Sequence, residues 1–193
     1  METEIRVLKF LLDSGSGAEH SIRAVSSGIK ADYNIVHRAC SALLGKGLIE
    51  KRRAGSSYLV RLSGKFSGQV FEAERQRADS LRSSKDIRAM EESLKDGAGT
   101  ANFVMLVFGS WAKGKQGKNS DIDIMFIVPD GCAGAEKKID ESVSLLPLPI
   151  HHMVFTESQF RKMIKSREKT VVSEAAENRI ILYGTEQYYE LIK

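Results

Sequence analysis

The sequence predicts an α+β chain in two parts: short helices with a β-hairpin, then a small domain with a mixed sheet flanked by helices. Apolar residues recur at helical spacing through the first third, and two largely apolar runs, FVMLVF (103–108) and IDIMFIV (122–128), bracket a loop rich in Gly, Ser and Lys. With 193 residues, 42% hydrophobic and 28% charged, the chain has the composition of a globular protein of one large or two small domains.

The N-terminal elements follow from spacing and caps. Apolar side chains at residues 5–12 predict a first helix. Ser21 precedes a second helix that closes near Gly28, and Asp32 or its neighbour is expected to cap a third that ends at Gly45. The stretch LIEKRRAGSSYLVRL (48–62) alternates apolar and polar residues around a turn at 54–57, which predicts a hairpin.

Three short helices followed by a basic hairpin resemble a winged helix-turn-helix domain, here residues 1–66. The segment NIVHRACSALLGKGLIEKRRAGSSYLVRL (34–62) resembles the recognition helix and wing of bacterial and archaeal transcription regulators. The resemblance implies that the third helix enters the major groove of double-stranded DNA and that the hairpin contacts phosphates. The candidate DNA-binding residues are Asn34, His37, Arg38, Lys51, Arg52, Arg53 and Arg61.

Charge agrees with that prediction, because residues 1–70 hold eleven Lys or Arg against six Asp or Glu. An alternative stays open, in which these side chains form a solvated basic face of a domain used for dimerisation or protein contact. Residues 67–193 are then expected to comprise a linker helix and the second domain. The linker, over 70–94, is a thin amphipathic pattern that fits either a connector or a helix that forms a homodimer.

The second domain is predicted around the two apolar runs. After Val128, the pattern predicts a helix at 135–146, a strand at 149–155 (PIHHMVF) and a helix that begins with a capping box of Thr156 and Gln159. A short apolar run at 179–184 precedes a terminal helix.

Two carboxylates stand at the start of the second apolar run. Because side chains alternate along a strand, Asp121 and Asp123 share one face of the predicted sheet with Met125 and Ile127. Two like charges beside an apolar strand repel and resist desolvation unless a cation lies between them. Mg²⁺ takes oxygen ligands and usually shares its shell with substrate phosphates, which makes it the natural partner.

The other side of the loop offers groups for phosphate. Gly109 and Ser110 end a buried strand at the expected start of a helix, where glycine permits a close approach and free amide groups supply donors. Lys113, Lys115 and Lys118 add positive charge to the same loop.

The sequence GSWAKGKQGKNSDIDI (109–124) resembles the signature of the nucleotidyltransferase superfamily that includes DNA polymerase beta, most closely its minimal nucleotidyltransferases. The resemblance implies that Gly109 and Ser110, with Lys113 and Ser120, bind the nucleotide, and that Asp121 and Asp123 bind the catalytic metal. It also implies Mg²⁺ or Mn²⁺ as cofactor and an NTP, expected to be ATP, as substrate, with the acceptor unknown. The alternative is an ordinary strand-turn-strand with solvated aspartates.

One position departs from that family. Its active members carry a third acidic residue on the strand after the crossover helix, where this chain has PIHHMVF. His152, or else His151, is expected at that place, as a general base or as a ligand of a borderline metal. The alternative is that both histidines are structural residues of the strand.

Two functions follow from these patterns. The first is an enzyme that transfers a nucleoside monophosphate from an NTP to an acceptor hydroxyl. The second is a transcriptional regulator whose nucleotidyltransferase domain is inactive or senses a nucleotide. No apolar run approaches the ~20 residues of a membrane span, and Cys40 and Cys132 are too far apart for a disulfide framework, so a cytoplasmic protein is expected.

Overall fold

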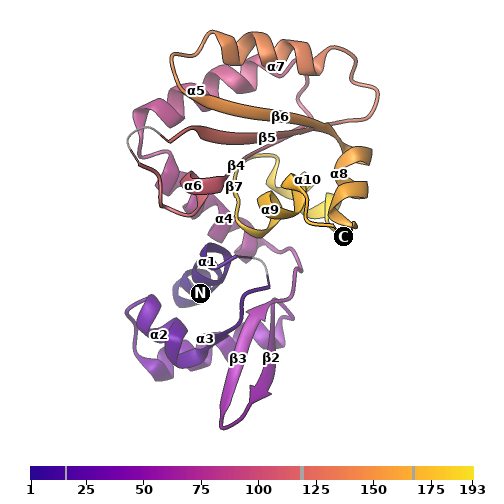
Figure 1. Ribbon diagram of the computed structural model, residues 1–193. Helices are drawn as coiled ribbons and strands as arrows, with labels where there is room; N and C mark the ends of the chain where they lie inside the picture. The colour runs from indigo at the N-terminus through magenta and orange to yellow at the C-terminus, as the bar shows by residue number, and fades with distance from the viewer. Residues whose placement is uncertain (16, 118–119, 167) are drawn as a thin grey trace. The chain divides into compact units, whose positions relative to one another are not determined.

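The computed structural model describes residues 1–15, 17–117, 120–166 and 168–193. The chain divides into two compact units, residues 1–77 and 78–193 (Figure 1). No helix within the described residues is long and apolar enough to cross a membrane.

The N-terminal unit consists of helices and a small antiparallel sheet. Its elements before the dividing helix are α1 (Glu2–Asp13), β1 (His20–Ser21), α2 (Ile22–Gly28), α3 (Tyr33–Gly45), β2 (Ile49–Ala54) and β3 (Ser57–Leu62). The strands pair in the order β1-β3-β2. The three predicted helices and the hairpin are confirmed, whereas β1 was not predicted, because two residues are too short to show a periodicity.

The predicted caps of this unit are present. The Ser21 side chain accepts a hydrogen bond from Ala24 N, and Asp32 Oδ1 accepts from Asn34 N at 2.8 Å, so each satisfies a backbone donor at its helix start. Cys40 is buried in α3, and burial raises the pKa of its thiol to about 11, which keeps the thiol protonated.

The division between the units lies inside α4 (Gly68–Leu81), at residue 77, and not before this helix at residue 67. The first part of α4 is tied to α1 by polar contacts. Gln69 Nε2 donates to Glu4 Oε2 at 2.8 Å, and Arg77 Nε donates to Asp13 Oδ1 at 2.8 Å. Because Arg77 is buried, its bond to Asp13 is a charge-assisted contact shielded from water on one side.

The single helix predicted over 70–94 is two helices, α4 and α5 (Lys85–Gly97). Arg82 directly follows the last residue of α4. Its guanidinium donates to both Glu91 carboxylate oxygens at 2.7 Å and to the carbonyl oxygen of Leu182 at 2.8 Å. Burial raises the pKa of Glu91, but hydrogen bonds from Arg82 and Lys95 outweigh it and hold that pKa below its ordinary value. A charged pair thus fixes α5 against the C-terminal sheet.

The C-terminal unit contains a mixed four-stranded sheet in the order β6-β5-β4-β7. Strand β4 is antiparallel to β5 and β7, and β5 is parallel to β6. This confirms the predicted mixed sheet flanked by helices. Its elements are β4 (Val104–Phe108), α6 (Gly109–Ala112), β5 (Ile122–Val128), α7 (Ala135–Ser144), β6 (Ile150–Thr156), α8 (Glu157–Ile164), α9 (Val171–Glu177), β7 (Ile180–Tyr183) and α10 (Thr185–Leu191).

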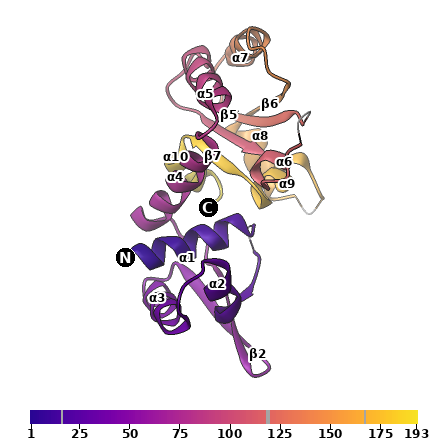
Figure 2. The same cartoon turned by 90° about the vertical axis from the view of Figure 1, so that its left-hand side faces the viewer.

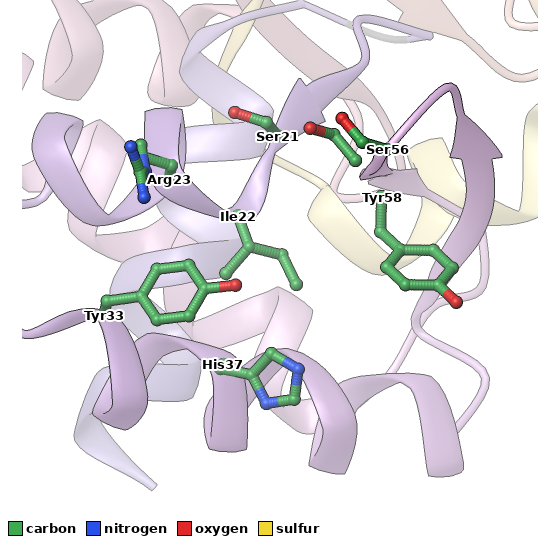
Figure 3. Close-up of a pocket in the computed structure, with 8 residues that line it drawn as sticks. Ser21, Ile22, Arg23, Tyr33, His37, Ser56 and Tyr58 are labelled. Carbon is green, nitrogen blue, oxygen red and sulfur yellow. The ribbon is translucent and has the colours of Figure 1, made fainter.

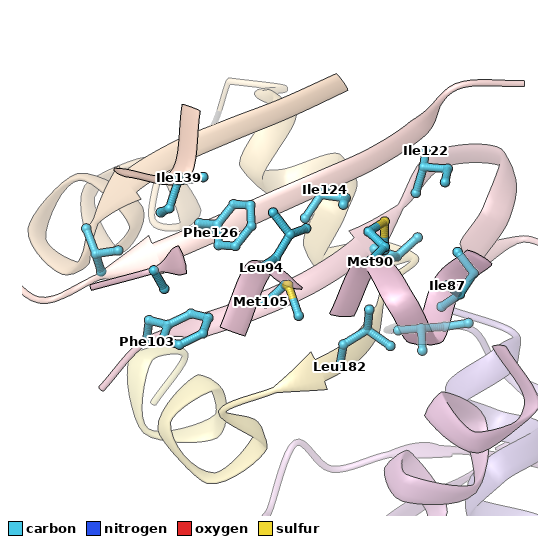
Figure 4. Close-up of a cluster of buried hydrophobic side chains, with 14 of the residues drawn as sticks. Ile87, Met90, Leu94, Phe103, Met105, Ile122, Ile124, Phe126, Ile139 and Leu182 are labelled. Atoms are coloured by element: carbon cyan, nitrogen blue, oxygen red, sulfur yellow. The ribbon is translucent and has the colours of Figure 1, made fainter. Parts of the chain in front are cut away.

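The core of this unit lies between the sheet and two helices, α5 and α7, which run side by side over one face (Figures 1 and 2). Figure 4 shows α5 placing Met90 and Leu94 against Ile124 and Phe126 of β5. These four side chains are fully buried, and each buried apolar side chain of this size contributes roughly 1.5–3 kcal/mol. The opposite face, which carries Asp123, is contacted by α8 and α10, and α9 packs against α8.

The helix after β6 begins at the predicted capping box. Gln159 N donates to the Thr156 side chain, and Thr156 N donates to Gln159 Oε1 at 2.9 Å. Helix α6 begins at Gly109, where a helix start was expected, whereas α9 was not predicted, because its seven residues show less than two turns of periodicity.

Candidate functional site

The site is built around Asp123, where β5 leaves the loop. Asp123 lies opposite Phe108, the last residue of β4, and Gly109 follows directly. Gly109 has a φ of +67°, and a Cβ placed on it would overlap the Asp123 carboxylate. The positive φ favours glycine, and any side chain here would force the Asp123 carboxylate to move. The start of α6 therefore lies against Asp123.

Trp111 fixes this turn from the other side. Its ring packs on the core cluster between the sheet and α5, and its Nε1 donates to the carbonyl oxygen of Ser120 at 3.3 Å. Lys115 N donates to Ser110 O at 2.9 Å, which closes the turn after α6. The sequence offered no signal for this role beyond the presence of the chain's single tryptophan.

Ser120 shapes the loop before β5. Its Oγ accepts a hydrogen bond from Gly117 N at 2.8 Å, so the hydroxyl that was expected to bind nucleotide already has a backbone partner. The predicted contribution of Lys118 lies outside the described residues. Ser110, in contrast, stands half-buried in the first turn of α6, beside Gly109.

Asp123 lies on the face of β5 away from Ile122 and Ile124, whereas Asp121 lies just before the strand, so a shared face of the two aspartates stays a prediction. Asp121 is exposed just before β5, and the Asp123 side chain is 28% exposed. Within the described residues, no group of three or more His, Cys, Asp or Glu side chains is gathered closely enough to hold a metal ion. A divalent ion fits this site with two carboxylate ligands at most, so water and substrate oxygens have to complete its shell, as is usual for Mg²⁺.

The structure corrects the placement of the histidines. Strands β5 and β6 are parallel, with Asp123 paired to His151 and Ile124 paired to His152. His151 Nδ1 lies 3.3 Å from Asp123 Oδ1, and its side chain is 61% exposed. His152 points to the α7 face, where its Nε2 lies 2.7 Å from Asp140 Oδ1. The expectation that His152 takes the place of the third acidic residue is therefore wrong in register, because His151, and not His152, lies beside Asp123.

The lysine expected at the nucleotide reaches a partner that the sequence did not indicate. Lys113 Nζ lies 3.8 Å from Glu174 Oε1 on α9. Both side chains are well exposed, so this contact is a weak surface pair that a bound polyanion would displace at little cost. Glu174 could not be found from sequence, because α9 itself shows no pattern.

The seven candidate DNA-binding residues are all exposed, but the hairpin divides its cations between two faces. Lys51 pairs with Val60 and Arg53 with Tyr58, on the face that carries the buried Val60. Arg52 and Arg61 lie on the other face, because neighbouring residues of a strand alternate. The face that carries Val60 is called the inner face below, and the other is called the outer face.

The cations of the two hairpin faces differ in their partners. On the outer face, Arg52 is bonded to Glu19, with Nε 2.7 Å from Oε1, and Arg61 Nε donates to Glu50 Oε2 at 2.8 Å. The hydrogen bond from Arg52 holds the pKa of Glu19 below its ordinary value. On the inner face, Lys51 Nζ lies 3.9 Å above the Tyr58 ring. The inner face therefore carries positive charge that acidic partners do not neutralise in these contacts.

The contact between Gly109 and Asp123 can be tested by comparing Gly109→Ala with Gly114→Ala. Both glycines have positive φ, +67° and +62°, so both substitutions incur the same backbone strain of about 1 kcal/mol, whereas only Gly109 has a neighbour within 4 Å. Gly109→Ala is expected to lower the free energy of unfolding by at least about 1 kcal/mol more than Gly114→Ala, measured by urea denaturation followed through Trp111 fluorescence.

Adding Asp123→Ala to Gly109→Ala should recover most of that extra loss, because the overlap is then removed. Equal destabilisation by the two glycine substitutions would contradict the close approach.

Comparison with protein families gives one match. Residues 87–182 match the family model described as the nucleotidyltransferase domain. No curated protein and no solved structure matches the chain significantly. The matched segment begins within α5, ends within β7 and contains Gly109, Asp123 and His151. The segment 87–182 is therefore similar to the nucleotidyltransferase domain, which supports the nucleotidyltransferase superfamily for this part of the chain.

Proposed function

We propose that the C-terminal unit transfers a nucleoside monophosphate from an NTP, with ATP as the expected donor, to a hydroxyl group of an acceptor. The observation that carries this proposal is the packing of the Gly109 turn against the Asp123 carboxylate, inside a nucleotidyltransferase domain. It brings a turn suited to phosphate next to a carboxylate suited to metal. These are the two groups that nucleotidyl transfer requires at one place.

In this proposal Asp121 and Asp123 hold a divalent ion, Mg²⁺ or Mn²⁺, together with oxygens of the triphosphate. When bound, such an ion neutralises phosphate charge and orients the triphosphate for in-line attack. Gly109 and Ser110 present backbone N–H groups of the first turn of α6 to the phosphates, and Lys113 adds a cation once Glu174 is displaced.

The reaction forms one bond and breaks another at the α-phosphorus. The acceptor oxygen bonds to that phosphorus, the bond to the bridging oxygen breaks, and pyrophosphate leaves. The acceptor proton needs a recipient, and the imidazole of His151, beside Asp123, stands where the family has a carboxylate.

Replacing both aspartates, Asp121→Asn with Asp123→Asn, should abolish the metal-dependent part of NTP binding, at least about tenfold in affinity, because no charged ligand remains for the ion. Thermal stability should stay level or rise, since two like charges are removed. Isothermal calorimetry with and without Mg²⁺ measures the first effect and a melting curve the second.

Asp140→Asn is the matched control for the aspartate pair, because this exposed carboxylate lies with His152 on the opposite face of the sheet. NTP affinity that is equal in the double variant and the native protein would remove the proposed site.

The place of the missing third carboxylate is tested by comparing the variants His151→Asp and His152→Asp. At residue 151, a carboxylate would face Asp123 and supply an oxygen ligand, so affinity for Mg²⁺ or transfer of α-phosphate label should rise, by about tenfold or more. At residue 152, the new carboxylate would face Asp140 and should only destabilise the domain. A gain in the residue 152 variant with none in the residue 151 variant would refute the placement.

A second function, binding of double-stranded DNA by the N-terminal unit, is proposed from the order of its elements. Three helices followed by a hairpin is the order of elements that the resemblance to a winged helix-turn-helix implies, and the N-terminal unit has that order. The exposed side chains of Asn34, His37 and Arg38 on α3 are the candidates for the groove, and the hairpin cations are those for phosphates.

The division of hairpin cations makes the DNA proposal specific. Lys51→Ala with Arg53→Ala should reduce the slope of log affinity against log salt by about 2, because each of the two cations neutralises one phosphate. Arg52→Ala with Arg61→Ala should reduce it by less, because these cations already bind Glu19 and Glu50. Fluorescence anisotropy with a labelled duplex over a salt series measures both, and no binding at low salt would end the proposal.

A regulator that only senses a nucleotide remains the alternative to the enzyme. It is favoured by the imidazole of His151 beside Asp123, where a third carboxylate was expected. Binding of Mg-NTP without transfer of α-phosphate label to any acceptor would favour it.

A further inference from the structure

A pocket of about 420 Å³ lies in the N-terminal unit, between α2, the start of α3 and the hairpin turn (Figure 3). Its volume is in the range of small-ligand sites. No acidic side chain occurs among the described residues that line it. The lining residues are Ser21, Ile22, Arg23, Tyr33, His37, Ser56, Ser57 and Tyr58.

The pocket is notable for exposed aromatic rings. Tyr33 is 45% exposed and Tyr58 is 48% exposed, so both side chains are open to contact with a ligand. Figure 3 shows the two tyrosines on opposite sides of the pocket, with His37 between them and Ile22 behind. The Tyr33 and His37 ring centroids lie 6.0 Å apart, so these rings form one tilted aromatic wall.

One cation, Arg23, lines the pocket, and two more, Lys51 and Arg53, neighbour its lining residue Tyr58. Arg23 is exposed on α2, and Lys51 Nζ lies 3.9 Å above the Tyr58 ring. Arg53 pairs directly with Tyr58 across the hairpin. Aromatic surface next to cations is the combination that proteins use to hold single nucleic-acid strands, with bases on rings and phosphates on cations.

Contacts with a base-paired duplex would not require the exposed tyrosine rings of the pocket. In a duplex the base faces are covered by their neighbours, so phosphate contacts require the cations and hydroxyls but no exposed ring face. A base that is free of its partner, at a strand end or in a single strand, has a face to stack.

We propose that the pocket formed by Tyr33, His37 and Tyr58 holds an unpaired nucleobase of a nucleic-acid strand, with the adjoining phosphates on Arg23 and Lys51. This rests on the proposed nucleic-acid binding of the N-terminal unit and not on the transfer reaction. The unit would then distinguish a duplex that ends in a single-stranded overhang from a blunt one.

The test uses the full chain and three labelled probes: a blunt DNA duplex, the same duplex with a short overhang, and the overhang strand alone. A 2-aminopurine at the first unpaired position reports stacking by loss of its fluorescence. The overhang duplex should bind about tenfold more tightly than the blunt one, as expected for one stacked base. Anisotropy gives the affinities, and free nucleoside monophosphate is the competitor.

Two double variants distinguish the contribution of the tyrosine rings from that of the tyrosine hydroxyl groups. Tyr33→Ala with Tyr58→Ala should remove the preference and the quenching, whereas Tyr33→Phe with Tyr58→Phe should keep both, because the rings remain. Binding of the single strand with the same dependence on the rings also supports the proposal, because its bases are unpaired.

Three outcomes overturn it. Equal affinity for blunt and overhang duplexes would refute the pocket while leaving duplex binding intact. A preference that survives the alanine variants, or competition by free nucleotide as strong as that of the strand, would do the same. No binding of any probe would remove the proposed DNA binding together with the pocket.

Discussion

The arrangement of the C-terminal unit depends on the close approach of a bare backbone to a carboxylate. Gly109 has no side chain, and Asp123 occupies the space where one would be. This contact requires β4 and β5 to be adjacent and the chain to turn sharply into α6. It therefore depends on both the order of the strands and the path of the loop. Trp111 then secures the turn through the core, so the carboxylate is held by packing that does not involve its own charge.

The two faces of the C-terminal sheet differ: one is buried in the core, and the other carries the candidate site. One face of β5 is wholly apolar and packs under α5 and α7, while the other face carries Asp123 near the loop and apolar residues further along. The two adjacent histidines of β6 are divided in the same way, one toward each face. Arg82, bonded to Glu91 and to the β7 backbone, holds α5 in place on the first face, away from the aspartates.

Much of this was predictable from sequence, and the misses have physical causes. The period of two along 122–128 set the face of Asp123, and cap residues such as Ser21, Asp32 and Thr156 marked helix starts. The choice between His151 and His152 depends on the register of β6 against β5, which a distant segment decides and a local pattern does not. The break between α4 and α5 depends on contacts of Arg82 with residues up to 100 positions away.

The net charge of the hairpin in the N-terminal unit is distributed unevenly between its two faces. Its cations are equal in number on the two faces, yet those on one face are bonded to Glu19 and Glu50 while Lys51, on the other, lies over an aromatic ring. The ribbon therefore has an electric dipole moment across its thickness. In the field of a polyanion, such a ribbon experiences a torque as well as an attraction. Its approach is thus oriented before any contact forms, and this orientation fades when salt shortens the range of the field.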